Sequence, residues 1–127
     1  MEMSTPVTTI WDGVLLLPVV GIVDSRRSET IMSAVLGAVA KENAREFILD
    51  ISGVGVVDTA VANYLIQITR AASLMGCRST ISGISPAIAQ TLVQLGVEVK
   101  NVRTTSTLMD ALKKAFERLN IQLLSMS

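Results

Sequence analysis

The sequence predicts an α/β domain in which a mixed β-sheet, opened by an N-terminal hairpin, packs against about four helices. Short β-branched and Leu-rich runs alternate with segments whose apolar residues recur every three or four positions. Turn and capping residues stand between these segments. The chain of 127 residues is 50% apolar, which suits a single domain with one hydrophobic core.

The first part of the chain predicts a hairpin and a helix. The strands Val7–Ile10 and Val14–Val20 are joined through Asp12-Gly13, a dipeptide typical of a tight turn. Asp24-Ser25 then offers an N-cap, and apolar residues at helical spacing predict a helix from about Ser25 to Lys41. The sheet therefore begins with an antiparallel pair.

The middle of the chain predicts a buried central strand and the best-defined helix. Phe47–Ile51 is a nearly continuous apolar run, as expected for a strand covered on both faces. The next helix should run from about Thr59 to Met75, and Gly76 stands where a glycine often ends a helix. Its apolar residues form a narrow stripe on one face of the helix: Val61, Leu65, Ile68, Ala72 and Met75.

The last third repeats the strand–helix alternation. It predicts a strand at Arg78–Gly83, a helix from Ser85-Pro86 to Leu95 that ends at Gly96, and a short strand at Val97–Val102. Thr107 with Asp110 then makes a weak capping box before an amphipathic helix. We expect the domain to span residues 1–120 and residues 121–127 to form a tail. The alternation implies right-handed crossovers.

Composition excludes several classes of function. Basic and acidic residues balance at 11 each and are scattered, so no basic stripe favours nucleic acid. No apolar run approaches the roughly 20 residues that span a bilayer, and the start at Met1 lacks a basic leader. We therefore expect a cytoplasmic protein that contacts neither nucleic acid nor membrane.

The inventory of reactive side chains argues against catalysis. The chain has no histidine and one cysteine, so no zinc site, no other metal site and no imidazole-based hydrolase is expected. Cys77 is interpreted as a small buried filler at a strand start. Asp50 ends the central strand without the acidic pair of a receiver domain, and Gly53 and Gly55 lack a phosphate-loop continuation. No cofactor is predicted, and a carboxylate-only mechanism is the enzymatic alternative left open.

Thr59 is the candidate site that helical phase points to. With the apolar stripe facing the core, Thr59 lies on the opposite side of the helix, beside Asn63 and Arg70. It also lies in the first turn, where free N–H groups and the helix dipole favour an anion. The alternative is that Asp58 or Thr59 simply caps the helix.

Other residues on these helices are less clearly placed by periodicity. Thr91 borders the buried face of its helix, where its hydroxyl could bond back to a carbonyl. Ile66 and Leu74 fall on the side of the central helix away from its stripe. Both are interpreted as ordinary exposed apolar residues or as contact residues.

Three stretches carry a resemblance to a known family. Leu49-Asp-Ile-Ser-Gly-Val-Gly-Val-Val-Asp-Thr59 and the run from Gly83 to Val97, with its Ala-Gln-Thr motif, resemble the STAS domain of anti-sigma-factor antagonists. The second run and the opening Ile10-Trp-Asp-Gly-Val-Leu-Leu-Leu-Pro18 are similar to the stressosome branch, the RsbR and RsbS proteins. In that branch two positions are phosphorylated, and this chain has threonine at both of them, Thr59 and Thr91, which resembles the RsbR type.

The resemblance implies a fold, sites and partners. Thr59 and Thr91 match the residues that a partner serine/threonine kinase phosphorylates in that branch, and Asp58 matches the supporting aspartate before the first of them. The implied partners are a switch kinase of the RsbT type, a phosphatase of the RsbX type, and RsbS- and RsbR-type proteins in a large assembly. A homodimer is also implied. The function would be that of a non-catalytic scaffold and phospho-switch.

Two alternatives stay open at this stage. RsbR-type proteins usually carry a separate N-terminal sensor domain, so the chain is either the C-terminal part of such a protein or a STAS-only homologue. Asp-Thr-Ala-Val-Ala stands where simple antagonists often have Asp-Ser-Ser-Gly-Leu, which does not favour direct control of an anti-sigma factor. The alternative function is a stand-alone nucleotide- or small-molecule-binding module, since α/β folds often bind ligands at strand ends.

Overall fold

The structure, a computed structural model, describes residues 7–94 and 102–126, with side chains described up to residue 120. One sheet holds five strands in the order β1-β2-β3-β4-β5. The strands and helices alternate along the chain as follows: β1 Thr8–Trp11, β2 Val14–Val20, α1 Ser25–Glu42, β3 Glu46–Gly53, α2 Thr59–Leu74, β4 Arg78–Ser82, α3 Pro86–Gln94, β5 Arg103–Thr104 and α4 Leu108–Met126.

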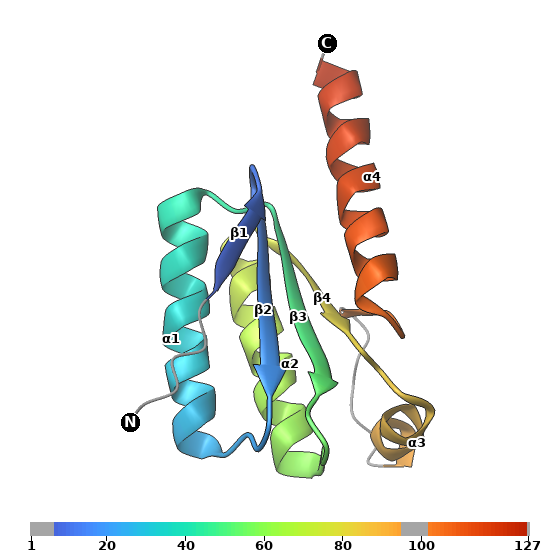
Figure 1. Cartoon of the computed structure of the whole chain (residues 1–127). Coiled ribbons are helices and arrows are strands. Elements are labelled where there is room, and N and C mark those ends of the chain that lie inside the picture. The colour runs from blue at the N-terminus through green and yellow to red at the C-terminus, as the bar shows by residue number, and fades with distance from the viewer. Residues whose placement is uncertain (1–6, 95–101, 127) are drawn as a thin grey trace.

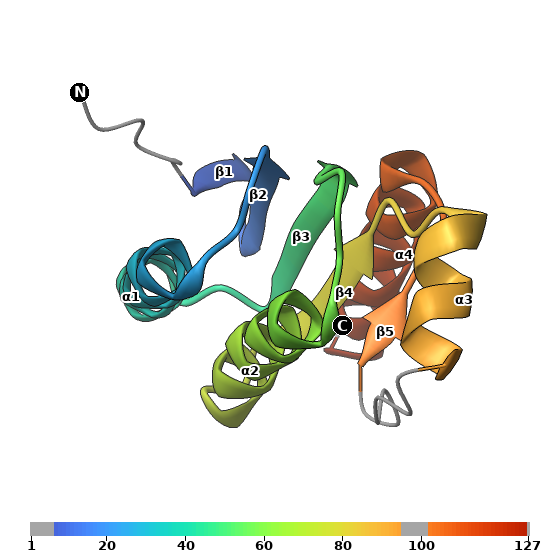
Figure 2. The same ribbon diagram turned by 90° about the horizontal axis from the view of Figure 1, so that it is seen from below.

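The sheet is mixed, as predicted. β1 and β2 pair antiparallel through a turn in which Gly13 has a φ of 81°, a value that favours glycine. The pairs β2–β3, β3–β4 and β4–β5 are parallel. Helices α1 and α2 cover one face of the sheet, α4 lies on the other, and α3 lies beside the β5 edge (Figures 1 and 2).

The predicted element starts agree with the observed caps. Asp24 caps α1 by accepting a hydrogen bond from the Arg27 N–H at 2.8 Å, and Ser85 caps α3 at 3.2 Å from the Ile88 N–H. Thr107 accepts from the Asp110 N–H at 3.1 Å at the start of α4. The expected end of the short helix at residues 95–96 and most of the expected strand at 97–102 lie outside the described residues, and the last described strand is β5.

The main core lies between the sheet and helices α1 and α2. It is aliphatic, with Phe47 as its one buried aromatic residue in the described chain. Ile66 is 5% exposed, so its expected place on the outer side of α2 was wrong. The reason is tertiary: α3 reaches this side of α2, and Ile66 lines a small apolar cavity together with Ile88 and Leu92. Leu74 is 90% exposed, as expected.

The opposite face of the sheet is held by α4 through a smaller contact. Ile48 packs with Ala111 and Ala115. Beside them the Glu46 carboxylate, 1% exposed, accepts hydrogen bonds from the guanidinium groups of Arg78 at 2.6 Å and Arg118 at 2.5 Å. This ion triad around the buried Glu46 carboxylate ties β3, β4 and α4 together.

Helix α4 continues past residue 120, and its C-terminal end projects beyond the strands (Figure 1). The boundary between a domain at 1–120 and a tail at 121–127 stays a prediction. Within the described ranges, no helix combines the length and the apolar character needed to cross a bilayer.

Candidate functional site

Thr59 is the first residue of α2, and its side chain is exposed, as helical phase predicted. The neighbours expected on its side of the helix, Asn63 and Arg70, are exposed as well. Within the described residues the Thr59 hydroxyl makes no hydrogen bond to the protein. It is therefore free to meet an incoming reagent.

Asp58 is the residue that caps α2. Its backbone is extended, with a φ of −93° and a ψ of −174°, and its carboxylate accepts a hydrogen bond from the Val61 N–H at 2.9 Å. Its carbonyl accepts from the Ala62 N–H, also at 2.9 Å. Of the two residues that could have capped this helix, Asp58 supplies the cap, and the Thr59 hydroxyl is left without that structural task.

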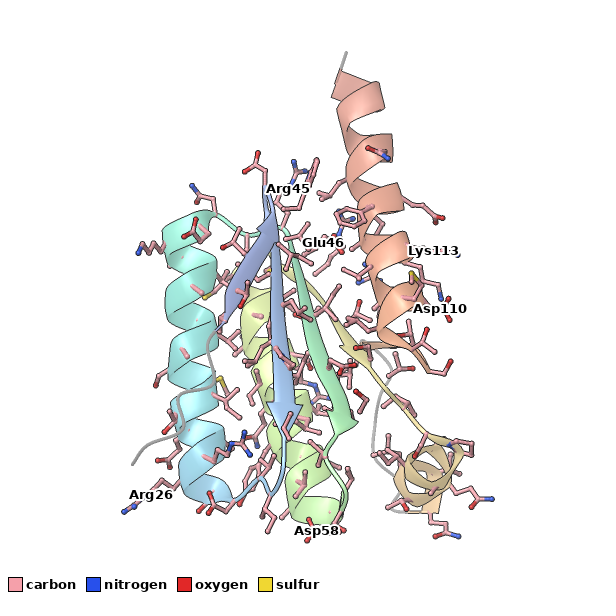
Figure 3. All side chains as sticks on the ribbon, in the orientation of Figure 1. Arg26, Arg45, Glu46, Asp58, Asp110 and Lys113 are labelled. Carbon is pink, nitrogen blue, oxygen red and sulfur yellow. The ribbon has the colours of Figure 1, made fainter. Side chains whose placement is uncertain are left out.

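The strand ends and loops beside the first turns of α1 and α2 expose apolar side chains. Three large side chains, on the last residue of β2 and on the loops that lead into α1 and α2, are highly exposed: Val20 at 65%, Ile22 at 86% and Val56 at 75%. Figure 3 shows Asp58 and Arg26 at this same end of the molecule, where the first turns of α1 and α2 emerge. An exposed hydroxyl, a carboxylate, a guanidinium and apolar side chains together make a surface suited to a protein partner.

Two glycines near this end, Gly53 and Gly83, lie where the chain is too closely approached for a side chain. A Cβ on Gly53 would lie 2.9 Å from the Val20 Cγ2, and a Cβ on Gly83 would lie 2.5 Å from the Ser52 nitrogen. Gly83 also has a φ of 84°. Gly53 thus serves strand packing, in agreement with the weak case for a phosphate loop.

Asp50 lies inside β3, not at its end, and it is buried. Its two carboxylate oxygens accept hydrogen bonds from the hydroxyls of Ser52 and Ser82, each at 2.6 Å. This arrangement fixes the ends of β3 and β4 side by side. Sequence reasoning missed the two serines, although a carboxylate inside an apolar strand calls for hydrogen-bond donors, and serines near the ends of this strand and the next are candidates for them.

Thr91 lies on α3 and is half-buried. Its hydroxyl donates a hydrogen bond to the Ala87 carbonyl at 3.0 Å, which is the back-bonded state expected of a boundary threonine. Thr59 and Thr91 occupy different helices, α2 and α3, and differ in exposure and in hydroxyl bonding. The structure thus places Asp58 and Thr59 together at the start of α2 and Thr91 on a different helix, α3.

Cys77 is the buried filler that the sequence predicted, 1% exposed and just before β4. Burial, reinforced by the nearby Glu46 carboxylate, raises the pKa of its thiol to about 12. In the part of the chain that the structure covers, no three potential metal ligands among His, Cys, Asp and Glu gather in one place.

Comparison with known proteins assigns this domain to a family. The profile of the STAS domain matches residues 5–121, so the chain belongs to the STAS-domain family. Among curated relatives, the chain is 36% identical over 125 residues to the RsbT co-antagonist protein RsbRA of Bacillus subtilis, covering 98% of this chain and 46% of that protein. It is 44% identical over 112 residues to RsbRB of the same organism, covering 88% and 40%.

Solved structures support the same branch. The fold matches RsbS from Moorella thermoacetica, in a variant form, with a TM-score of 0.79 and 25% identity, covering 93% of this chain and 99% of that one. It also matches a chain in a solved structure that describes the molecular architecture of the stressosome. The TM-score is 0.72 and the identity 26%, and the match covers 90% of this chain and 98% of that one. The RsbR-type homology read from the motifs is confirmed. The chain spans less than half the length of the curated relatives named above.

Proposed function

We propose that this chain is a non-catalytic scaffold and phospho-switch domain of a bacterial stress-signalling complex. It binds a serine/threonine switch kinase of the RsbT type and releases it when Thr59, and then Thr91, are phosphorylated. The proposal draws on its relatives, which are named as RsbT co-antagonists. The single observation that carries it is the exposed, unbonded hydroxyl of Thr59 beside the Asp58 cap.

The position of Thr59 suits a phosphate. The N–H groups of the first helical turn have no intrahelical acceptor, and Asp58 uses only that of Val61. A phosphate on the first residue of α2 would meet the remaining donors and the positive end of the helix dipole. The modified helix would therefore stay folded.

The same phosphate would change the surface that a partner meets. It adds a charge of about −1.5 to −2 next to the Asp58 carboxylate. The end of the molecule at which Val20, Ile22 and Val56 are exposed would then carry a strongly anionic point. Apolar docking against such a point requires desolvation of the phosphate, so kinase binding weakens.

The order of the two modifications follows from accessibility. The Thr59 hydroxyl is exposed and unbonded, whereas the Thr91 hydroxyl is bonded to the Ala87 carbonyl on a half-buried position. A kinase must break that bond and reach into the boundary of α3 before it can modify Thr91. Thr59 is therefore the first acceptor and Thr91 the second.

The remaining partners belong to the same proposal. We infer a homodimer in the cytoplasm that assembles with related RsbS- and RsbR-type STAS proteins, and a phosphatase of the RsbX type that resets the switch. The phosphoryl group comes from the kinase and its ATP, so the domain needs no catalytic group or cofactor of its own.

Phosphate mapping tests the proposal directly. The chain is incubated with its cognate kinase and Mg-ATP, and the phosphate is located by mass spectrometry. We expect phosphate on Thr59, and its loss in Thr59→Val, which keeps the side-chain shape but removes the hydroxyl. The matched control is Thr30→Val, which removes a hydroxyl from an exposed threonine of α1. Phosphate absent from Thr59 in the parent chain overturns the proposal.

Kinase release is measured separately. Titration of the kinase with unmodified and Thr59-phosphorylated chain should show at least about tenfold weaker binding of the phosphorylated form, equal to about 1.4 kcal/mol. Equal affinities contradict the switch. Stabilisation of the chain by ATP or GTP with no kinase present would favour a nucleotide-binding module instead.

A further inference from the structure

A second candidate site lies on the α4 side of the sheet, away from the start of α2. There residues of β4, β5 and α4 line a pocket of about 300 Å³ that opens to solvent. Its lining consists of hydroxyl and cationic side chains: Thr80, Arg103, Thr104, Thr105, Lys114 and Arg118. None of these described lining residues carries a carboxylate or an aromatic ring.

The charges around the pocket are not neutralised by the described protein. Arg103 and Lys114 are exposed, and neither forms an ion pair with any residue of the described ranges. Arg118 gives Nε and one Nη2 hydrogen to Glu46. Its Nη1 donors have no partner among the described residues. Glu46 is shared with Arg78, so that triad keeps a net positive charge.

Thr80 supplies an independent sign of a missing ligand. Its side chain lines the pocket and is only 3% exposed. No hydrogen bond to its hydroxyl is formed by any described group, although buried hydroxyls are nearly always paired. By contrast, the neighbouring Thr105 hydroxyl donates to the Thr107 carbonyl at 2.7 Å. An acceptor oxygen in the pocket would satisfy Thr80.

We propose that this pocket binds a small phosphorylated metabolite through its phosphate oxygens. Three cationic side chains and a buried hydroxyl are donors suited to an oxyanion. The volume is at the lower end of the range for ligand pockets, about 300–1,000 Å³. No described residue of the lining offers an aromatic ring on which a base could stack. A compact ligand such as a diphosphate or a sugar phosphate fits these features.

The bound anion would join α4 to the sheet. Lys114 and Arg118 come from α4, whereas Thr80 and Arg103 come from β4 and β5. A ligand contacting both groups adds a cross-link to the Ile48 cluster and the Glu46 triad. This site is independent of the proposed switch, since it contains neither phosphoacceptor and needs no kinase.

The test is an NMR titration of the whole chain with inorganic pyrophosphate and, in a second arm, with ribose 5-phosphate. We expect saturable shifts of the amides of Thr80, Thr104 and Thr105. Saturation by pyrophosphate alone assigns the site to a free polyphosphate, and saturation by both assigns it to phosphate groups in general. No saturable shift with either compound overturns the proposal.

Two sets of variants make the test specific. Combined Arg103→Gln and Lys114→Gln should weaken pyrophosphate binding at least tenfold. The charge-matched control, Lys41→Gln with Lys113→Gln, removes two exposed cations outside the lining and should change binding less than twofold. Figure 3 shows Lys113 directed away from the sheet. Equal weakening by both pairs overturns a defined site.

Thr80→Val separates a ligand role from a structural one. Valine keeps the branched shape and removes the unpaired hydroxyl, so the free protein should be as stable as the parent or more so. Pyrophosphate binding should nevertheless weaken severalfold. Unchanged binding, or a less stable free protein, would show that the Thr80 hydroxyl serves the fold and not a ligand.

Discussion

Helices α2 and α3 each carry one proposed phosphoacceptor, but they are attached to the sheet very differently. α2 has seven buried residues: Val61, Ala62, Leu65, Ile66, Ile68, Thr69 and Ala72. α3 has none, and it meets the core through half-buried side chains such as Ile88 and Leu92. A phosphate on Thr59 would therefore alter a firmly supported surface, whereas one on Thr91 would act on a helix that is easily displaced.

The largest expected difference is in packing energy. Leu65→Ala on α2 should lower the free energy of unfolding by about 2–5 kcal/mol, because Leu65 is fully surrounded by the core. Leu92→Ala on α3 should lower it by only about 1 kcal/mol, in proportion to its partial burial. Urea unfolding of both variants measures the two losses in the free energy of unfolding. Equal losses would mean that α3 is held as firmly as α2.

A smaller effect should appear when charge is placed at the two threonines. Thr91→Asp loses the bond to the Ala87 carbonyl and adds a negative charge near the C-terminal end of α3, so it should cost about 1 kcal/mol. Thr59→Asp adds its charge at the N-terminal end of α2 and should stay within about 0.5 kcal/mol of the parent.

Hydrogen exchange measures both variants, because we infer that α3, which has no buried residue, opens without unfolding the rest of the domain. Thr91→Val is the control, since it loses the hydroxyl bond without adding charge. If Thr59→Asp accelerated exchange in α2 as much as Thr91→Asp does in α3, the contrast between the helices would be refuted.

The sequence could predict what depends on local pattern. The apolar stripe of α2 fixed its phase and hence the exposure of Thr59, and the capping residues located the starts of α1 and α3. The burial of Ile66 could not be read from that stripe because α3 supplies the cover. Glu46 precedes the predicted run Phe47–Ile51, and its ion pairs could not be read locally because Arg78 and Arg118 lie 32 and 72 positions away along the chain.

The assignment of Asp58 as the cap of α2 predicts a loss of stability no larger than that of Thr91→Asp. Asp58→Ala should cost about 1 kcal/mol of stability, because the Val61 N–H loses its acceptor. Asp58→Asn should retain most of the parent's stability, because the amide oxygen can still accept this bond. Asp24→Ala at the matching position of α1 is the comparison. Thr59→Ala should cost less than about 0.5 kcal/mol, since surface changes away from a cap are mild. Thermal and urea unfolding measure all four, and an equal cost for Thr59→Ala would show that its hydroxyl shares the capping task.

The smallest expected signal is the reaction of Cys77 with a thiol reagent at pH 8. Cys77 lies in the core that α2 covers, and burial raises the pKa of its thiol to about 12. The reactive thiolate is therefore scarce in the folded protein at pH 8, whereas an unfolded cysteine, with a pKa of about 8.5, is partly ionised. Labelling in native buffer should then proceed only as fast as this core opens, and urea should make it complete. Rapid labelling of the native protein would show that the α2 side of the sheet opens as readily as we infer for α3.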